Sequence, residues 1–183
     1  VCPMKKILFC LSLILVFSCI ALPCLAAQFE AEGVFTITYD KNDFEVDTTS
    51  YADENVDDTY HWYGLIYNDD YAIDMTMFDY EDLEKVTLFT LDEDERQQYV
   101  DFMLDAFSDD HIQFIGALDV SQYNIPFYFF SCQDSEGEYL FAETVVKGKA
   151  IRFAIYYNDA DLGVDQDLLD SLTVLVGTFL PVA

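Results

Sequence analysis

The order of hydrophobic patterns along the chain constrains its fold most strongly. The sequence contains runs rich in β-branched and aromatic residues at 33–39, 61–67, 71–78, 125–132, 139–146 and 150–157. Segments with helical spacing lie at 91–108, between the two groups of runs, and from residue 165 onward. This order favours an α+β class over the strict alternation of a doubly wound fold. Short connections between the last three runs predict an antiparallel meander within one domain.

Both helical segments carry start signals and an apolar stripe. Asp92 followed by Glu95 matches a capping box, and Asp165 is the expected N-cap of the second helix. The predicted stripes are Val100, Met103, Leu104 and Phe107 in the first helix, and Leu168, Leu169, Leu172, Leu175 and Val176 in the second. We therefore expect an antiparallel sheet that is flanked by the two helices.

The N-terminal segment has the arrangement of an export signal. Lys5 and Lys6 precede an apolar run at 7–21, and small residues follow, ending in Ala26 and Ala27. The run has 15 residues, which is shorter than the roughly 20 residues that span a bilayer. We predict a hydrophobic signal helix within residues 1–27, cleavage after Ala27, and a single domain at 28–183. The expected destination is secreted or extracytoplasmic.

Lipidation is the alternative fate of the same segment. The residues before Cys19 resemble a bacterial lipobox, whereas Pro23 makes Cys24 a poorer candidate. A lipid on Cys19 would tether the domain to the outer face of a membrane. Otherwise the signal would be the chain's sole membrane contact.

Charge and cysteine content limit the classes of function. The chain has a net charge of −27, and removal of Lys5 and Lys6 leaves 6 basic against 35 acidic residues, a net charge of −29. Such a surface repels nucleic acid and attracts cations, basic peptides or other cationic ligands. After cleavage Cys132 is the one remaining cysteine, so no internal disulfide is expected, and its aromatic neighbours predict a buried thiol. We expect a monomer.

The C-terminal half resembles bacterial exported proteins of the PsbP-like fold. The residues that carry the resemblance are Ile125-Pro126-Phe127, the turn at 134–139, the strand at 142–146 and the helix that ends at Thr178-Phe179. The likeness extends over about 35–180 and implies an antiparallel sheet flanked by helices, a PsbP-like sandwich. Members of this family include a photosystem II extrinsic subunit, a Ran-binding factor and bacterial lipoproteins. They act mostly by binding other molecules, so the resemblance implies binding and brings no catalytic motif.

The sequence offers no recognised catalytic constellation. His61 is expected on a strand in an aromatic surface and His111 in a loop, with no partners at zinc-ligand spacing. Neither a nucleophile elbow nor a phosphate-binding glycine loop is present. We therefore expect no catalytic and no cofactor-binding residues. A small extracellular hydrolase is the least favoured alternative, and it would need His61 or His111 beside a hydroxyl or carboxylate.

Calcium is the metal that this acidic composition most favours, because it takes oxygen ligands. Asp159, Asp161 and Asp165 alternate in a segment that can wrap a cation, but Gly163 stands one position too early for an EF-hand and no closing Glu follows. The other interpretation is a solvated turn that leads into the last helix. A calcium-responsive acidic module is thus the alternative function.

A cluster of aromatic residues is a candidate binding surface, with core packing as the alternative for some of its members. Trp62, Tyr63 and Tyr67 lie in one predicted strand with Tyr60 directly before it, and alternation turns some of these side chains into the core. The outward ones would suit sugar stacking or peptide binding. We therefore expect a non-enzymatic binding or interaction domain with a strongly acidic surface and an unknown protein, peptide or cationic partner.

Overall fold

The computed structural model describes residues 26–52, 59–79, 86–107, 111–119, 125–135 and 137–182. The strands are β1 (Ala26–Ala31), β2 (Phe35–Asp40), β3 (Glu45–Asp47), β4 (Tyr60–Tyr67), β5 (Tyr71–Asp79), β6 (Gln113–Asp119), β7 (Pro126–Gln133), β8 (Glu138–Val146), β9 (Lys149–Tyr157) and β10 (Leu180–Pro181). The helices are α2 (Glu93–Ala106), α3 (Gln166–Val176) and a short 3-10 helix, η3 (Leu88–Thr90). The predicted α+β class is confirmed.

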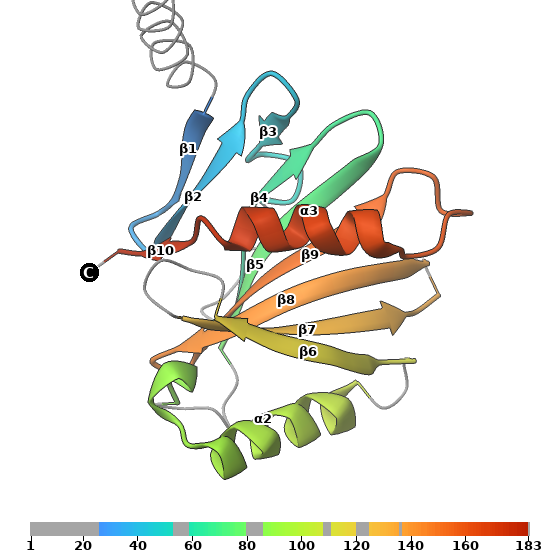
Figure 1. Cartoon of the computed structure of the whole chain (residues 1–183). Coiled ribbons are helices and arrows are strands. Elements are labelled where there is room, and N and C mark those ends of the chain that lie inside the picture. The colour runs from blue at the N-terminus through green and yellow to red at the C-terminus, as the bar shows by residue number, and fades with distance from the viewer. Residues whose placement is uncertain are drawn as a thin grey trace, which may run out of the picture.

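The strands form two antiparallel sheets (Figure 1). The large sheet has the order β3-β4-β5-β9-β8-β7-β6, and the small sheet has the order β1-β2-β10. Strands β7, β8 and β9 follow one another as neighbours, which confirms the predicted meander. The hairpin of β4 and β5, joined through Asn68, Asp69 and Asp70, is also as predicted.

Consecutive residues of the large sheet face opposite sides, so the sheet has two separate cores. On β7, Phe127 and Phe129 belong to the first core, whereas Tyr128 and Phe130 belong to the second. We call the side that carries Phe129 the first face and the side that carries Phe130 the second face. Strands β8 and β9 alternate in the same way between the two cores.

Helix α3 and the small sheet cover the first face. Leu168, Leu172, Leu175 and Val176 of α3 are buried there, as the predicted stripe requires. Phe35 of β2 lies at the centre, with its ring centroid 5.4 Å from those of Tyr63, Phe153 and Phe179. Asp165 caps α3 by accepting a hydrogen bond from the Leu168 N–H.

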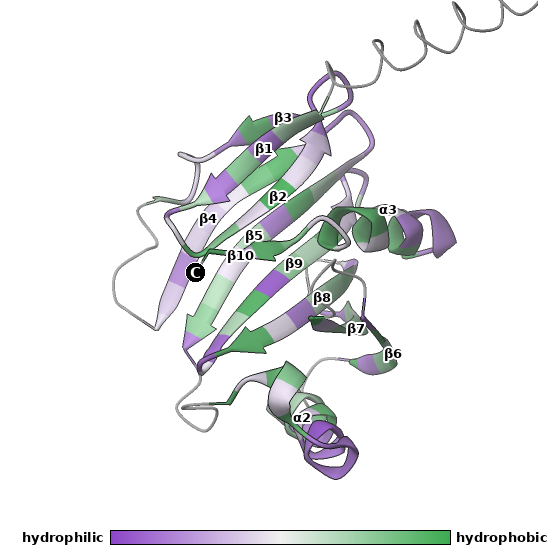
Figure 2. Cartoon of the chain, turned by 60° about the vertical axis from the view of Figure 1, so that its left-hand side comes forward, coloured by the Kyte–Doolittle hydropathy of each residue, from purple (hydrophilic) through white to green (hydrophobic). Residues whose placement is uncertain are grey.

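Helix α2 packs on the second face near β6, β7 and β8. Asp92 and Glu95 form the predicted capping box, and Tyr99, Val100 and Met103 are buried. In Figure 2 the hydrophilic side of α2 lies away from the strands. Because α2 lies near one edge of the sheet, no helix among the described residues covers the second face over β4, β5 and β9 (Figures 1 and 2).

The small sheet is the main difference from the sequence-based expectation of one sheet. Its first strand begins at Ala26, within the segment assigned to the signal. Ala26 pairs with Asp40 and Ala27 with Tyr39, while Phe29 and Ala31 are the buried residues of the strand. Small residues at 26 and 27 fit both an extended edge strand and a cleavage region, so the sequence did not reveal the strand.

The predicted signal helix and Cys19 lie outside the described residues. Within the described part of the chain, no helix combines the length and apolar character needed to cross a membrane.

Candidate functional site

The uncovered half of the second face contains a hollow of about 770 Å³. We call it the aromatic hollow, because aromatic residues from four strands line it: Tyr60, Trp62, Phe78, Tyr139, Tyr156 and Tyr157. Asp74, Asp134 and Glu138 contribute carboxylates, and Arg152 contributes a guanidinium group. Pockets of roughly 300–1,000 Å³ are the usual size for small ligands.

Strand alternation explains why these side chains meet. On β4, Tyr60 and Trp62 face the hollow, while Tyr63, the residue after Trp62, joins the core of the first face. The pairing of β4 with β5 shifts between Trp62 and Gly64, which marks a bulge. A Cβ at Gly64 would lie 2.9 Å from the carbonyl oxygen of Asp47, so a glycine lets β3 approach β4 closely.

Asp74 of β5 is held in place by two aromatic donors in the hollow. The Trp62 indole Nε1–H donates to Oδ1 at 3.0 Å, and the Tyr156 hydroxyl donates to Oδ2 at 2.9 Å. These donors come from β4 and β9, the two neighbours of β5 in the sheet. The carboxylate is partly buried and, among the described residues, has no cationic partner. Its orientation is therefore fixed while its negative charge stays unbalanced.

Tyr51 forms the rim of the hollow over Trp62. Its ring is edge-on to the Trp62 ring, with centroids 5.4 Å apart, and 46% of the residue is exposed. The turn before it is ordered by Asp47, which accepts hydrogen bonds from Thr49 and Ser50. These bonds, led by that of the Ser50 hydroxyl, lower the pKa of Asp47 to about 2.

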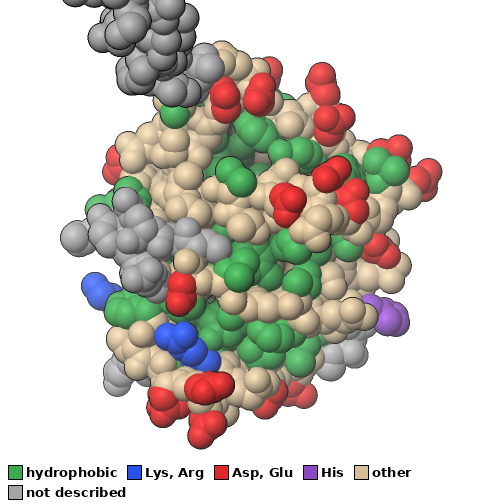
Figure 3. All heavy atoms as spheres, viewed as in Figure 1, with side chains coloured by type: hydrophobic (Ala, Val, Ile, Leu, Met, Phe, Trp, Pro, Cys, Tyr) green, Lys and Arg blue, Asp and Glu red, His purple; other side chains and the backbone are tan. Residues whose placement is uncertain are grey.

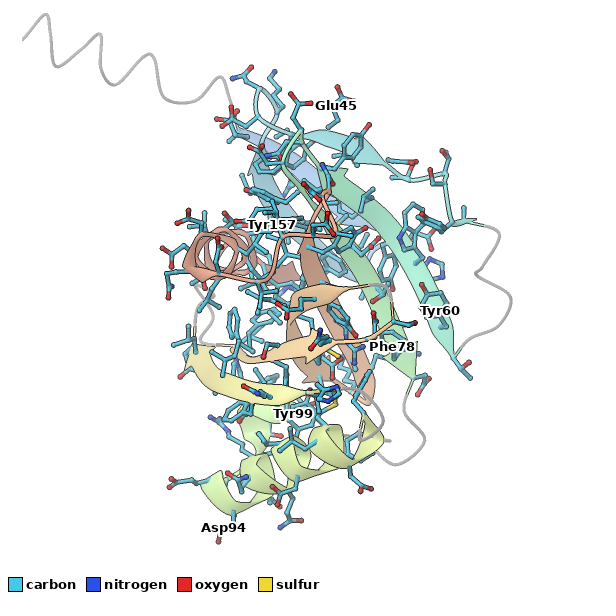
Figure 4. All side chains as sticks on the ribbon, turned by 90° about the vertical axis from the view of Figure 1, so that its right-hand side faces the viewer. Glu45, Tyr60, Phe78, Asp94, Tyr99 and Tyr157 are labelled. Atoms are coloured by element: carbon cyan, nitrogen blue, oxygen red, sulfur yellow. The ribbon has the colours of Figure 1, made fainter. Side chains whose placement is uncertain are left out.

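Two loops form the opposite rim. Asp134 accepts a hydrogen bond from the Gly137 N–H in the turn between β7 and β8. Glu138 accepts one from the Val164 N–H, which ties this turn to the loop between β9 and α3. A Cβ at Gly163 would lie 2.7 Å from Glu138 Oε2, so the glycine makes room for that carboxylate. Figure 4 places Tyr60 and Phe78 at neighbouring ends of β4 and β5, with Tyr157 nearer α3.

The covered half of the same face contains a second carboxylate, Glu143 of β8, which is fully buried. The Tyr99 hydroxyl donates to its Oε1 at 2.6 Å, and Arg152 donates to its Oε2 from Nε at 2.8 Å, with a further nitrogen at 2.7 Å. The Arg152 guanidinium lies 4.5, 4.8 and 4.4 Å from the ring centroids of Phe78, Phe107 and Phe141. A buried cation thus sits among three rings and is neutralised by one carboxylate.

The predicted aromatic surface is divided by the structure. Tyr60 and Trp62 line the hollow, whereas Tyr63 is buried in the first core. The Tyr67 hydroxyl donates to Glu45 at 2.8 Å at the outer end of β4. Some of these side chains therefore face outward and one faces the core, as the alternation of a strand predicts.

The two histidines lie away from the hollow. His61 of β4 has its Nε2 3.4 Å from Glu32 Oε2, a carboxylate whose side chain is 74% exposed, and its ring lies against Tyr63. His111 lies in the loop before β6, and its backbone N–H donates to the carbonyl of Gln133. Neither lines the aromatic hollow or the smaller acidic hollow beside α3.

The calcium candidates serve local structure. Asp159 accepts a hydrogen bond from the Asp161 N–H within the loop. Asp165 accepts one from Leu168 and one from the Tyr157 hydroxyl at 2.9 Å; the Leu168 bond is the main cause of its lowered pKa. Within the described residues, no group of three or more His, Cys, Asp and Glu side chains is placed to hold a metal ion.

Cys132 is buried in the core under α2, as predicted. It contacts Tyr139, and burial is the main cause of the raised pKa of the Tyr139 hydroxyl, with the contact to Cys132 second. The thiol is 2% exposed and belongs to the packing of the second face.

Sequence reasoning missed Asp74, Tyr156, Glu143 and Arg152. A signal was present, since Asp74 stands between Ile73 and Met75, and Glu143 interrupts an apolar strand. Charged residues at such positions are rarely buried without partners. The identity of the partners depends on neighbouring strands that are distant in the sequence, so the pairs themselves were not predictable.

Acidic side chains lie around the edge of the face that carries α3. On the face that carries α3, Figure 3 shows Asp and Glu around the rim, hydrophobic side chains across the middle, and few Lys or Arg. With a net charge of −27, the protein attracts cations over distances that salt shortens.

No family model matches the chain, and no curated protein sequence matches it. Among solved structures, it is similar to the solution structure of cyanobacterial PsbP (CyanoP) from Synechocystis sp. PCC 6803. The match covers 88% of this chain and 95% of that chain, with 13% sequence identity and a TM-score of 0.47. This is a similarity between two structures, and it says nothing about activity.

Proposed function

We propose that this protein is an exported binding domain whose ligand occupies the aromatic hollow and leaves chemically unchanged. The observation that carries the proposal is the hollow itself. Aromatic residues of β4, β5, β8 and β9 line the hollow around a fixed carboxylate, on the half of the sheet face that no described helix covers. Hollows that combine apolar walls with a few oriented polar groups are typical ligand sites.

The lining of the hollow supports binding over catalysis. Among the described residues that line it, none is a His, Cys or Ser, the commonest bases and nucleophiles. Asp134 and Glu138 each accept a backbone hydrogen bond that holds the rim. Asp74 accepts hydrogen bonds from Trp62 and Tyr156. Each of the three carboxylates therefore takes part in hydrogen bonds that hold the structure of the hollow.

Trp62 provides a direct test, because it is the single tryptophan of the chain and its indole N–H binds Asp74. The protein should therefore give a single indole N–H resonance in an NMR spectrum. A panel of monosaccharides, short peptides and organic cations would be titrated against the purified protein. We expect at least one class to shift this resonance in a saturable way, together with resonances of Tyr60 and Tyr156.

The control is Tyr39→Phe, which alters a tyrosine of the small sheet outside the hollow, compared with Tyr156→Phe, which removes a donor to Asp74. Ligand affinity should fall in Tyr156→Phe and persist in Tyr39→Phe. If every ligand that binds shifts resonances elsewhere and leaves Trp62 unmoved, the hollow is not the site and the proposal is wrong.

Export rests on the N-terminal segment and is tested separately. Cleavage after Ala27 would remove two residues from the start of β1 and keep its buried Phe29 and Ala31. The mass of the mature protein from the native host should correspond to residues 28–183. A mass that retains Cys19 with a lipid would show an anchored form instead.

A further inference from the structure

Two carboxylates of the second face, Glu143 and Asp74, each accept a hydrogen bond from a tyrosine hydroxyl and differ in their second partner. Glu143 accepts a bond from an aromatic hydroxyl, that of Tyr99, and pairs with the guanidinium of Arg152. Asp74 accepts bonds from an indole N–H and a tyrosine hydroxyl and has no cation among the described residues. The difference between them is therefore a missing positive charge on the open side.

The unused lone pairs of Asp74 indicate the geometry of the cationic group that would bind it. A carboxylate oxygen has two lone pairs, and each oxygen of Asp74 uses one for Trp62 or Tyr156. One acceptor position remains on each oxygen. Two adjacent acceptors match the parallel N–H groups of a guanidinium, which binds carboxylates through two bonds at once.

The charges around the hollow favour the same ligand. Its lining has three carboxylates and one guanidinium, and that guanidinium is already neutralised by Glu143. The lining is thus negative overall, and an anionic ligand would be repelled. A ligand with one or more positive charges would offset part of this negative charge on binding.

The aromatic walls favour a planar, weakly hydrated cation. Tyr60, Phe78, Tyr139 and Tyr156 are each partly exposed and line the hollow. Phe78 already has the Arg152 guanidinium 4.5 Å from its centroid. Guanidinium groups stack on aromatic faces more readily than ammonium groups do.

We propose that the aromatic hollow binds a guanidinium group, as carried by an arginine side chain, with Asp74 as its counterion. This assignment rests on the proposed function, because it names the ligand class of the same site. The hollow has more room than one guanidinium fills, so the group would enter as part of a larger ligand, and an arginine-containing peptide fits this requirement.

The test compares three peptides of the same length: acetyl-Gly-Arg-Gly-amide, the citrulline analogue, which is neutral and nearly isosteric, and the lysine analogue. Binding is followed through the Trp62 indole resonance and by calorimetry at 0.15 M salt. We expect the arginine peptide to bind at least about tenfold more tightly than the citrulline peptide, because only the arginine peptide carries a positive charge that attracts the Asp74 carboxylate. The lysine peptide should be intermediate.

Asp74→Asn should remove the preference for arginine over citrulline, because it deletes the charge and retains one acceptor oxygen. Asp119→Asn, the same change on the exposed β6, is the matched control and should preserve the preference. Methylguanidinium separates the sources: binding as tight as that of the peptide indicates a small guanidine, and tighter peptide binding indicates a peptide.

Two results would overturn the inference while leaving the binding function intact. One is equal affinity for the arginine and citrulline peptides. The other is a shift of the Trp62 resonance by sugars or neutral peptides when the arginine peptide produces none. If no ligand class shifts this resonance, the proposed function itself fails.

Discussion

The two halves of the second sheet face show the same chemical arrangement in two environments. Under α2, Glu143 is fully buried and is bound by Tyr99 and Arg152. On the open half, Asp74 is partly buried and is bound by Trp62 and Tyr156. The first carboxylate is paired within the chain, and the second has aromatic donors but no cation among the described residues.

A helix that covers a sheet face removes the charged side chains beneath it from water. A carboxylate removed from water loses several kcal/mol of hydration, so a buried one must come with its own cation. Asp74 keeps contact with solvent and needs only orientation. The same sheet can thus use one half for stability and leave the other half for a ligand.

The largest effect on stability is expected from a substitution in the covered half. Arg152→Met removes the cation and leaves the Glu143 carboxylate buried with Tyr99 alone. We expect the free energy of unfolding to fall by about 3–5 kcal/mol, the usual cost of leaving a buried charge uncompensated. Urea denaturation followed by Trp62 fluorescence would measure it.

The double variant Arg152→Met/Glu143→Gln is the control for this prediction. It replaces the ion pair by neutral groups of similar size and should recover most of the lost stability. A single variant that costs less than about 1 kcal/mol would show that Glu143 is hydrated or neutral, and the contrast between the halves would disappear.

A smaller effect is expected from the matching change on the open half. Asp74→Asn keeps one oxygen for Trp62 and offers an amide to the Tyr156 hydroxyl, so we expect a loss of about 1 kcal/mol in the free energy of unfolding. The same urea titration measures it. A cost equal to that of Arg152→Met would mean that Asp74 is a structural carboxylate like Glu143.

Acid should weaken the rim of the open half. The pKa of Asp47 is lowered from 3.8 to about 2 in the folded state, so its stabilising contribution is complete above pH 3.8 and disappears as pH falls through about 2. Asp47→Asn should flatten this part of the pH dependence of unfolding. An unchanged acid profile in the variant would show that the bonds from Ser50 and Thr49 do not order the turn before Tyr51.

Calcium is expected to produce the smallest effect. Asp159 and Asp165 are engaged in a turn and a helix cap, and Asp165 also binds Tyr157. We therefore expect the same melting temperature in excess calcium and in chelator. A site at a hundredfold excess over its Kd would add roughly 2.7 kcal/mol. A clear rise with calcium, absent with magnesium, would support a calcium-responsive module.

Much of the fold was predictable because its signals are local. The capping box of Asp92 and Glu95, the N-cap at Asp165 and the hairpin turn after Tyr67 depend on residues only a few positions apart. The small sheet was not predicted, since β1 begins in a segment whose small residues also suit a cleavage site. Its pairing with β2 depends on burial of Phe29 and Ala31 against a distant core.

The candidate site was predicted only in part. Tyr60 and Trp62 were recognised as part of an aromatic surface, but Asp74 was not recognised as its centre. Trp62, Asp74 and Tyr156 come from adjacent strands, and residues 74 and 156 are 82 positions apart. No local pattern indicates that such residues share one hydrogen-bonded group.

The sequence by itself determined the α+β class, the meander, the two capped helices and the acidic character, because periodicity, capping and charge are properties of nearby residues. Only the tertiary structure decided which carboxylate received a cation and which remained open. That outcome depends on strand order and on where α2 comes to lie, since these determine which side chains lose contact with water.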